Sequence, residues 1–317
     1  MLKMVTSSRT LMIKNQALSE SELIWRTLYC RCKDQSPFSS YDWYTALCTH
    51  IGRHDPDILS FWHGQQPVGV MAAMKTKGVL RAIQDERVTD VTDILIEPGF
   101  EIPVIEALAG YISDSDLGLD IFPLESTSTI VKHLPLFLDD IVVNDKDVCP
   151  YLNLPTTWTD YLKYLKSKHR HELRRKMRRA AGIELHTASV DHLDVFLELM
   201  ARSDIEKKKF LTPEIQMFIK GIVTSFAHEN WLHMRYACLG KTPVAALLSF
   251  KKADRIYLYN SGYDPRYMDL SPGIVSIALD IKHAIQDGST YYDFLRGKEI
   301  YKLRFGTLLR TTKRISR

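Results

Sequence analysis

Two stretches of the chain match each other at an offset of 176 residues. HGQQPVGVMAAMK begins at His63, and LGKTPVAALLSFK begins at Leu239. The positions that carry the match are Gly64, Pro67 and Val68 in the first copy and Gly240, Pro243 and Val244 in the second. In each copy glycine and proline separate two apolar runs, a pattern that predicts a β-hairpin.

The match continues after both hairpins. TDILIEPGFEIPVIEALAGYI and LGLDIFPLE follow the first, and IYLYNSGYDPRYMDLSPGIVSIALDIKHAI and YYDFLRG follow the second. Each copy predicts a strand, a glycine-bearing loop, an amphipathic helix and a buried strand. In the buried strands, Asp120 of the first copy corresponds to Asp293 of the second. A repeat this long indicates duplication of a domain of about half the chain. We expect an α+β fold (an α/β three-layer arrangement), with a mixed sheet covered by helices in each half.

Helices are expected before each hairpin. Thr212-Pro213-Glu214 has a hydroxyl cap, a proline at the first helical position and an acid in the first turn. The apolar residues that follow it keep the period of a helix: Ile215, Phe218, Ile219, Ile222, Val223 and Phe226. Residues 191–200 and SSYDWYTALCTHIG predict two more helices. The pattern breaks near residues 150–157, which predicts domains at 1–150 and 151–317.

The amino-acid composition limits which broad classes of protein this chain can belong to. The chain has 317 residues, of which 45% are hydrophobic and 25% charged, as in soluble globular proteins of two domains. No apolar run is long enough to span a bilayer, and the first residues do not resemble a signal peptide. The five cysteines are irregularly spaced, which favours reduced thiols. We therefore expect a cytoplasmic protein without a metal site.

Positive charge is concentrated in one segment. Residues 163–182 hold nine Lys or Arg and one Glu, whereas the whole chain has a net charge of +4. Tyr161, Leu165, Leu173 and Met177 would form a narrow apolar stripe along a single helix. Such a helix could be merely solvated, or could contact a phosphorylated small molecule, an acidic membrane surface or tRNA. Because only Tyr164 offers an aromatic ring, RNA ranks below a small phosphorylated substrate. Arg174 and Arg175 are the candidate substrate contacts.

The loop after the second-copy strand is a candidate anion site. Ser271-Pro272-Gly273 opens a helix, in which Ser271 suits the cap and Gly273 lets a ligand approach the backbone. The N–H groups of a helix N-terminus and its dipole attract anions, and Arg266 could add a charge. A well-capped helix without a ligand would explain the same residues. The first copy has Glu97 and Glu101 here and no basic residue, so only the second copy is expected to bind.

Four stretches carry a family resemblance: FSSYDWYTAL, GKTPVAALLSF, YNSGYDPRYMDLSPGI and YDFLRGKEIYKLRFG. Together they resemble the GNAT-type acyltransferases of the CelD branch, which is associated with cellulose and exopolysaccharide biosynthesis and related to Fem-type peptidyltransferases. The resemblance covers nearly the whole chain. It implies two tandem GNAT folds, of which the second binds acetyl-CoA or another acyl-CoA and the first is not catalytic.

The resemblance also implies where the cofactor pyrophosphate would bind, namely on Arg266, Leu270, Ser271, Gly273 and Ile274. Here the chain departs from the usual GNAT pattern, because it has one glycine in place of a pair and Pro272 removes an N–H donor. Fem-type relatives use aminoacyl-tRNA instead, which leaves the acyl donor open.

In GNAT folds the acyl group lies between two strands that splay apart, which would be RIYLYNSG and TYYDFLR. A carboxylate in the apolar second strand is paired with a cation or has a raised pKa. Asp293 is thus the candidate base or ammonium anchor, with Glu299 as second candidate. Tyr301 occupies the place of the acidic tyrosine of GNAT enzymes. The candidate substrate contacts are Arg296, Lys302 and Tyr259. A salt bridge from Asp293 to Arg296 or Arg304 is the structural alternative, favoured by the equivalent Asp120.

Three functions remain open from the sequence. The first is an acyltransferase that acts on an amine or sugar intermediate of envelope or polysaccharide synthesis, peripheral to the inner membrane through segment 163–182. The second is a Fem-like transferase that uses charged tRNA. The third is a non-catalytic, partner-binding component of a polysaccharide synthase.

Overall fold

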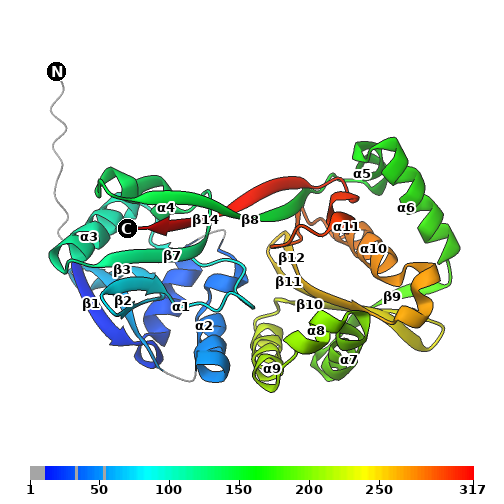
Figure 1. Cartoon of the computed structure of the whole chain (residues 1–317), viewed down its shortest axis with the longest axis horizontal. Coiled ribbons are helices and arrows are strands. Elements are labelled where there is room, and N and C mark those ends of the chain that lie inside the picture. The colour runs from blue at the N-terminus through cyan, green and yellow to red at the C-terminus, as the bar shows by residue number, and fades with distance from the viewer. Residues whose placement is uncertain (1–10, 33–34, 53–54) are drawn as a thin grey trace. The chain divides into compact units, whose positions relative to one another are not determined.

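A strand that crosses from one half of the chain to the other marks the domain boundary. The computed structural model describes residues 11–32, 35–52 and 55–317 (Figure 1). Unit 1 comprises Met1–Lys146 and Thr311–Arg317, and unit 2 comprises Asp147–Arg310. The expected boundary at residue 150 falls inside strand β8 (Val142–Asn153). The assignment of the C-terminus needs correction, because the last seven residues belong to unit 1.

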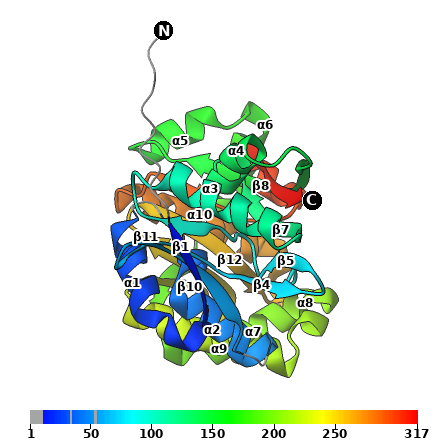
Figure 2. The same ribbon diagram turned by 90° about the vertical axis from the view of Figure 1, so that its left-hand side faces the viewer.

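Unit 1 places helices on both faces of its strands. In Figure 2, α3 and α4 lie on one side of β1 and β7, and α1 and α2 on the other. Strands β1, β2, β3 and β6 form an antiparallel sheet in that order, and β7 pairs with β5 and with β14. The elements are β1 (Met12–Ala17), α1 (Glu22–Arg31), α2 (Tyr41–Leu47), β2 (Asp57–His63), β3 (Gln66–Met71), β4 (Ala73–Thr76), β5 (Val79–Ala82), β6 (Ile94–Ile96), α3 (Glu101–Asp114), β7 (Gly118–Glu125), α4 (Thr129–His133) and β14 (Leu308–Ser316).

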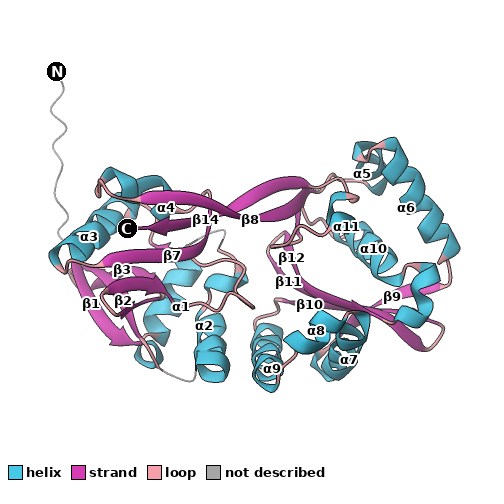
Figure 3. Cartoon of the chain, viewed as in Figure 1, coloured by secondary structure: helices cyan, strands magenta, loops and turns pink. Residues whose placement is uncertain are grey.

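Unit 2 repeats this plan around strands in the order β8-β13-β12-β11-β10-β9. Figure 3 shows α7, α8 and α9 on one face of the strands and α5, α6 and α10 on the other. The elements are α5 (Trp158–Tyr164), α6 (Ser167–Arg179), β9 (Ile183–Ala188), α7 (Leu193–Ser203), α8 (Ile205–Phe210), α9 (Pro213–His228), β10 (Leu232–Leu239), β11 (Thr242–Lys252), β12 (Arg255–Tyr263), α10 (Pro272–Gln286), β13 (Tyr291–Asp293) and α11 (Ile300–Leu303). The expected fold class is confirmed.

The two predicted hairpins are β2–β3 and β10–β11. Their turns contain Gly64 at φ 61° and Gly240 at φ 60°, the left-handed region in which glycine is favoured. Both pairs are antiparallel, and each has a register shift close to the turn. The sequence repeat therefore marks the same backbone conformation in both units.

The cap and the periodicity predicted for helix α9 are both confirmed. Thr212 accepts a hydrogen bond from the backbone N–H of Ile215, and Pro213 is the first helical residue. The six apolar residues of the predicted stripe are all fully buried. Burying each of these side chains contributes about 1.5–3 kcal/mol to stability, so α9 is held against β10 mainly by this stripe.

Two neighbouring strands of unit 2 pair only over a short stretch. Strands β12 and β13 are parallel partners only over Arg255–Tyr257 and Tyr291–Asp293, whereas β12 continues to Tyr263. A register shift opposite Leu248 and Ser249 interrupts β12 at Tyr259. Further along, a Cβ at Gly262 would lie 2.2 Å from the backbone nitrogen of Met200, so only glycine allows α7 to cross here. Strand β12 thus continues past the end of β13 and packs against α7, and the separation of the two strands expected from the sequence stays a prediction.

The basic segment forms two helices rather than one. Helix α5 ends at Tyr164, Leu165 is extended with ψ 136°, and α6 begins at Ser167. Tyr161, Leu165 and Leu173 are buried as expected. At the bend, the side chain of Leu165 packs against Gly306. A Cβ added at Gly306 would lie 2.8 Å from Leu165 Cδ2.

Candidate functional site

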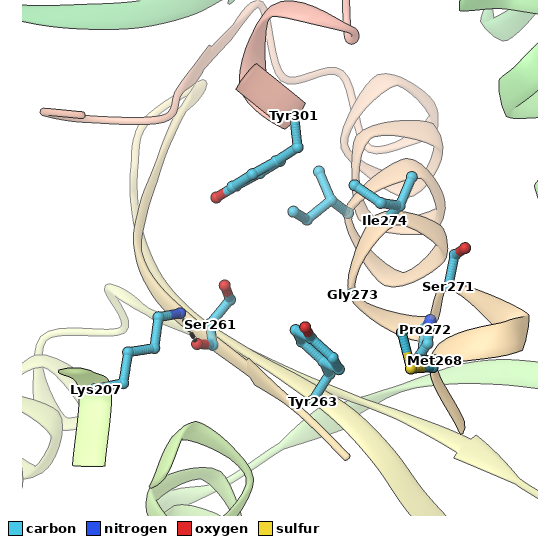
Figure 4. Close-up of a pocket in the computed structure, with 10 residues that line it drawn as sticks. Lys207, Ser261, Tyr263, Met268, Ser271, Pro272, Gly273, Ile274 and Tyr301 are labelled. Carbon is cyan, nitrogen blue, oxygen red and sulfur yellow. Dashed lines mark hydrogen bonds between the residues drawn. The ribbon is translucent and has the colours of Figure 1, made fainter. Parts of the chain in front are cut away.

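A cavity of about 340 Å³ lies beside the end of β12 in unit 2. Its walls come from the end of β12, the N-terminus of α10, helix α8 and helix α11 (Figure 4). The lining is mainly apolar with a few polar atoms, as in small-molecule sites. The lining residues are Lys207, Ser261, Tyr263, Met268, Ser271, Pro272, Gly273, Ile274, Ile277 and Tyr301.

Helix α10 begins at this cavity in a conformation that the sequence did not predict. Ser271 is the residue before the helix, but it lies in the left-handed region at φ 52° and its side chain makes no capping hydrogen bond. Its hydroxyl instead accepts a hydrogen bond of 2.7 Å from Lys176 of α6. The expected serine cap is therefore wrong, because the left-handed backbone turns the hydroxyl away from the N–H groups of the first turn.

Without that cap, the first turn of α10 keeps a free donor. Pro272 occupies the first helical position and has no N–H. The backbone N–H of Gly273 has no acceptor among the described residues, whereas that of Ile274 bonds to the carbonyl of Ser271. A Cβ at Gly273 would lie 3.3 Å from the ring of Tyr263. The α10 dipole, the Gly273 N–H and the Lys176 ammonium together form a site that attracts an anion.

Of the expected pyrophosphate contacts, Ser271, Gly273 and Ile274 line the cavity, and Leu270 and Arg266 do not. Arg266 donates from Nη2 to Asp264 Oδ2 at 2.6 Å, and its own backbone N–H bonds to Asp264 Oδ1. This contact holds the pKa of Asp264 at about 2. Arg266 thus fixes the turn before α10.

Tyr301 points into the cavity from α11, opposite the start of α10 (Figure 4). Burial raises the pKa of its hydroxyl well above the usual value, the charge of Glu299 raises it further, and a hydrogen bond with the Ser261 side chain lowers it. The phenol consequently stays protonated at neutral pH and can donate a proton to a strong base.

Lys207 is a cavity residue that the sequence argument missed. It extends from α8, and its Nζ donates to the backbone oxygen of Ser261 at 2.5 Å. Burial lowers the pKa of this amine, although the carboxylates of Glu299 and Asp204 oppose the shift. A lysine with a lowered pKa in a cavity is a candidate for proton transfer.

Asp293 does not line the cavity. Its carboxylate is fully buried, where Oδ1 accepts from the backbone N–H of Leu295 at 2.8 Å and Oδ2 pairs with Arg310. The partners expected from the sequence were wrong: Arg296 pairs with Asp147 at 3.0 Å, and Arg304 lies 3.5 Å from Glu172. The equivalent Asp120 of unit 1 also pairs with an arginine, through two hydrogen bonds from Arg314.

The other expected residues also lie outside the lining. The Glu299 carboxylate is 3.0 Å from Lys302 Nζ, which also donates to the carbonyl of Arg296 at 2.9 Å. The ring of Tyr259 packs 5.4 Å from that of Phe250. Arg174 and Arg175 lie on the exposed face of α6. Their proposed roles in substrate binding or catalysis stay predictions.

The sequence contains weak signals for Lys207 and Lys176, which were not among the expected site residues. Lys207 belongs to the run IEKKKF, which resembles an exposed charged helix, and the flanking Lys208 and Lys209 are indeed exposed. Lys176 shares the face of α6 that carries buried Leu173 and partly buried Met177. A lysine beside the buried stripe of a helix is partly desolvated, whereas its neighbours are not.

Comparison with known proteins agrees with this geometry. Residues 167–303 match the family model of the acetyltransferase (GNAT) domain. The search of curated proteins found no match. Among solved structures, FemX is similar over 96% of this chain and 96% of its own, with 10% identity and a TM-score of 0.67.

Two further solved structures share the fold. A conserved protein of unknown function from Bacteroides thetaiotaomicron is similar over 97% of this chain and 99% of its own, with 11% identity and a TM-score of 0.60. L-PGS from Bacillus licheniformis is similar over 86% of this chain and 90% of its own, with 10% identity and a TM-score of 0.52.

Within the described residues, no helix is both long and apolar enough to cross a membrane. The internal repeat, the fold match to FemX and the family match give one consistent result. The chain has two GNAT-like folds in tandem, and residues 167–303 of its second unit match the acetyltransferase (GNAT) domain.

Proposed function

We propose that the protein is an acyl-CoA-dependent N- or O-acyltransferase whose reaction takes place in the cavity of unit 2. The observation that supports this proposal is that an N-terminal N–H without an acceptor on α10 and a protonated tyrosine of α11 lie at one cavity beside the end of β12. The acceptor would be an amine or sugar intermediate of cell-envelope or exopolysaccharide synthesis, as the resemblance to the CelD branch implies.

The anion site at α10 supports a phosphate-bearing acyl donor. Gly273 offers a backbone N–H, and Lys176 lies 2.7 Å from Ser271 at the same point. A diphosphate would complement both groups, since its charge is stabilised by the helix dipole and by the ammonium. Acetyl-CoA or another acyl-CoA carries such a diphosphate, with the thioester at the far end of a flexible arm.

The cavity residues can move the two protons that acyl transfer requires. For an amine acceptor, the nitrogen attacks the thioester carbonyl, a C–N bond forms and the C–S bond breaks. Lys207 in its neutral form takes the proton that the attacking ammonium loses. Tyr301 donates its hydroxyl proton to the departing thiolate. The lowered pKa of Lys207 and the raised pKa of Tyr301 suit these opposite directions of transfer.

Calorimetry with acetyl-CoA tests the donor, and release of free thiol in the presence of candidate amines and amino sugars tests the transfer. We expect binding with a dissociation constant below about 1 mM, which corresponds to about 4 kcal/mol. Lys207→Met should lower turnover about 100-fold and leave acetyl-CoA binding unchanged. Absence of binding at millimolar acetyl-CoA would refute the proposal.

A Fem-like transferase that uses aminoacyl-tRNA is the second candidate. The fold match to FemX and the exposed cations of α6 favour it. In that case tRNA should bind with an affinity that falls steeply with salt, and acetyl-CoA should not bind. A partner-binding component without catalysis would bind neither substrate.

A further inference from the structure

A second concavity of unit 2 lies between helices α5 and α6 on one side and α11 with the start of β14 on the other. Its volume is about 630 Å³. We call it the basic groove; its lining residues are Tyr164, Lys166, Lys168, His169, Glu172, Ile300, Leu303, Arg304, Gly306, Thr307 and Leu309. The catalytic cavity shares none of these residues.

The floor of the basic groove is fixed by direct contacts between its two walls. Tyr161 of α5 donates its hydroxyl to the carbonyl of Phe305 at 2.9 Å. Leu165, at the bend between α5 and α6, packs on Gly306, which has φ 77°. Phe305 itself is buried in the core of unit 2. The groove is therefore part of the folded unit, and its rim residues are presented in fixed positions.

Large apolar side chains are exposed around the rim. Tyr164 is 75% exposed, Ile300 69% and Leu309 56%. Leu303 and Leu308 are also exposed. Exposed apolar residues gathered from a helix end, a second helix and a strand mark a surface that a partner covers, whereas isolated ones need no explanation.

The same rim is cationic. Lys166, Lys168, His169 and Arg304 line the groove, and its one acidic lining residue, Glu172, lies 3.5 Å from Arg304 Nη1. The exposed arginines of α6 continue this positive surface away from the groove. The complementary partner is thus anionic and also accepts aliphatic side chains.

We propose that the basic groove docks unit 2 on the surface of an anionic phospholipid bilayer. Phosphate headgroups would neutralise the lysines, and Ile300, Leu303 and Leu309 would enter the boundary between headgroups and acyl chains. RNA fits less well, because its bases stack on aromatic rings and the rim offers only Tyr164.

This docking would connect the bilayer to the catalytic cavity through one short helix. Helix α11 carries Ile300 and Leu303 on the groove side, whereas Tyr301 points into the cavity. A bilayer bound at the groove would lie beside the helix that holds the tyrosine. Docking itself does not depend on acyl transfer, so its test is independent of the proposed function.

Vesicle flotation of the full-length protein tests the inference. We expect binding to phosphatidylglycerol vesicles and little binding to phosphatidylcholine vesicles. Each lysine near an anionic surface contributes about fivefold, so Lys166→Ala with Lys168→Ala should weaken binding about 25-fold. Ile300→Ser with Leu309→Ser should weaken it about tenfold, and wild-type binding should persist in part at about 1 M salt, where the screening length falls to about 3 Å.

Matched controls lie elsewhere on unit 2. Lys220→Ala with Lys241→Ala removes two exposed lysines, and Met217→Ser removes an apolar side chain that is 52% exposed. Both should bind vesicles as the wild type does, and circular dichroism should show all variants folded. Unchanged binding by the Ile300/Leu309 variant would overturn the inference, as would binding of tRNA but not of vesicles. Absence of vesicle binding would also overturn it.

Discussion

The two units begin their long helices in opposite ways. In unit 1, the carboxylate of Glu101 accepts a hydrogen bond of 2.9 Å from the backbone N–H of Gly99, so α3 supplies its own anion. In unit 2, the corresponding start of α10 has Pro272 and a free N–H on Gly273, and Lys176 lies beside it. The helix that follows the same strand and loop therefore has a carboxylate of its own at its N-terminus in unit 1, and an N–H without an acceptor in unit 2.

This difference shows which features belong to the fold and which to the site. Asp120 and Asp293 hold equivalent places and each pairs with an arginine, so an aspartate here serves both copies. Tyr301 has no counterpart in the first copy, whereas Lys176 and Lys207 lie before the matched stretches. Tyr301 is therefore a better candidate for chemistry than Asp293, and Lys207 joins it because it lines the same cavity.

The largest effect is expected from breaking the shared ion pair. Asp293→Asn removes the fully buried carboxylate charge that pairs with Arg310, which should cost about 3 kcal/mol. Asp120→Asn should cost about 1 kcal/mol, because Arg314 is partly exposed. Urea unfolding measures both. A stable but inactive Asp293→Asn protein would instead restore the catalytic role expected from the sequence.

The next effect is expected on turnover alone. Tyr301→Phe removes the proton donor and should lower acyl transfer about 100-fold, with acetyl-CoA binding unchanged. Tyr111→Phe, on α3 of unit 1, is the matched control and should keep full activity. Full turnover by Tyr301→Phe would remove the tyrosine from the mechanism.

A carboxylate added at the start of α10 should give unit 2 the kind of helix N-terminus that unit 1 has. Pro272→Glu places a carboxylate at the first position of α10, as Glu101 does in α3. It should weaken acetyl-CoA binding about tenfold, because the added charge occupies the dipole and repels the diphosphate. Pro272→Ala should bind within about twofold of wild type. Equal affinities of the two variants in calorimetry would place the donor elsewhere.

The last prediction concerns how the stability of unit 1 depends on pH. Burial raises the pKa of Asp93 to about 7, against the hydrogen bonds from Ser128 and from the N–H of Ile94. Because the folded form holds this proton more tightly than the unfolded chain, the stability of unit 1 should fall as pH rises from about 4 to about 7. Asp93→Asn should remove this loss, so thermal unfolding should show the variant gaining stability over the wild type as pH rises from about 4 to about 8. A stability that does not depend on this substitution at either pH would exclude the effect.

The periodic and local features could be predicted from the sequence. The turn glycines, the Thr212 cap and the buried face of α9 depend on residues within a few positions of each other, so their pattern suffices. The family resemblance also singled out Tyr301, which lines the cavity, while its role stays a prediction.

Long-range partners could not be predicted. The Arg310 that binds Asp293 lies beyond the expected charged loop, and Lys176 reaches Ser271 across 95 positions. Lys207 lies within a run of three lysines, and only packing against β12 distinguishes it from its exposed neighbours. The cap prediction for Ser271 was wrong because the residue type suits a cap, but the sequence does not reveal that its backbone is left-handed.

The assignment of Thr311–Arg317 to unit 1 has a consequence for how the chain is made. Strand β7 finds its β14 partner only after nearly the whole chain has been synthesised, since the two strands are separated by all of unit 2. Domains generally fold during synthesis in order from the N-terminus. In this protein unit 1 begins the chain but can complete its fold only after all of unit 2 has been synthesised.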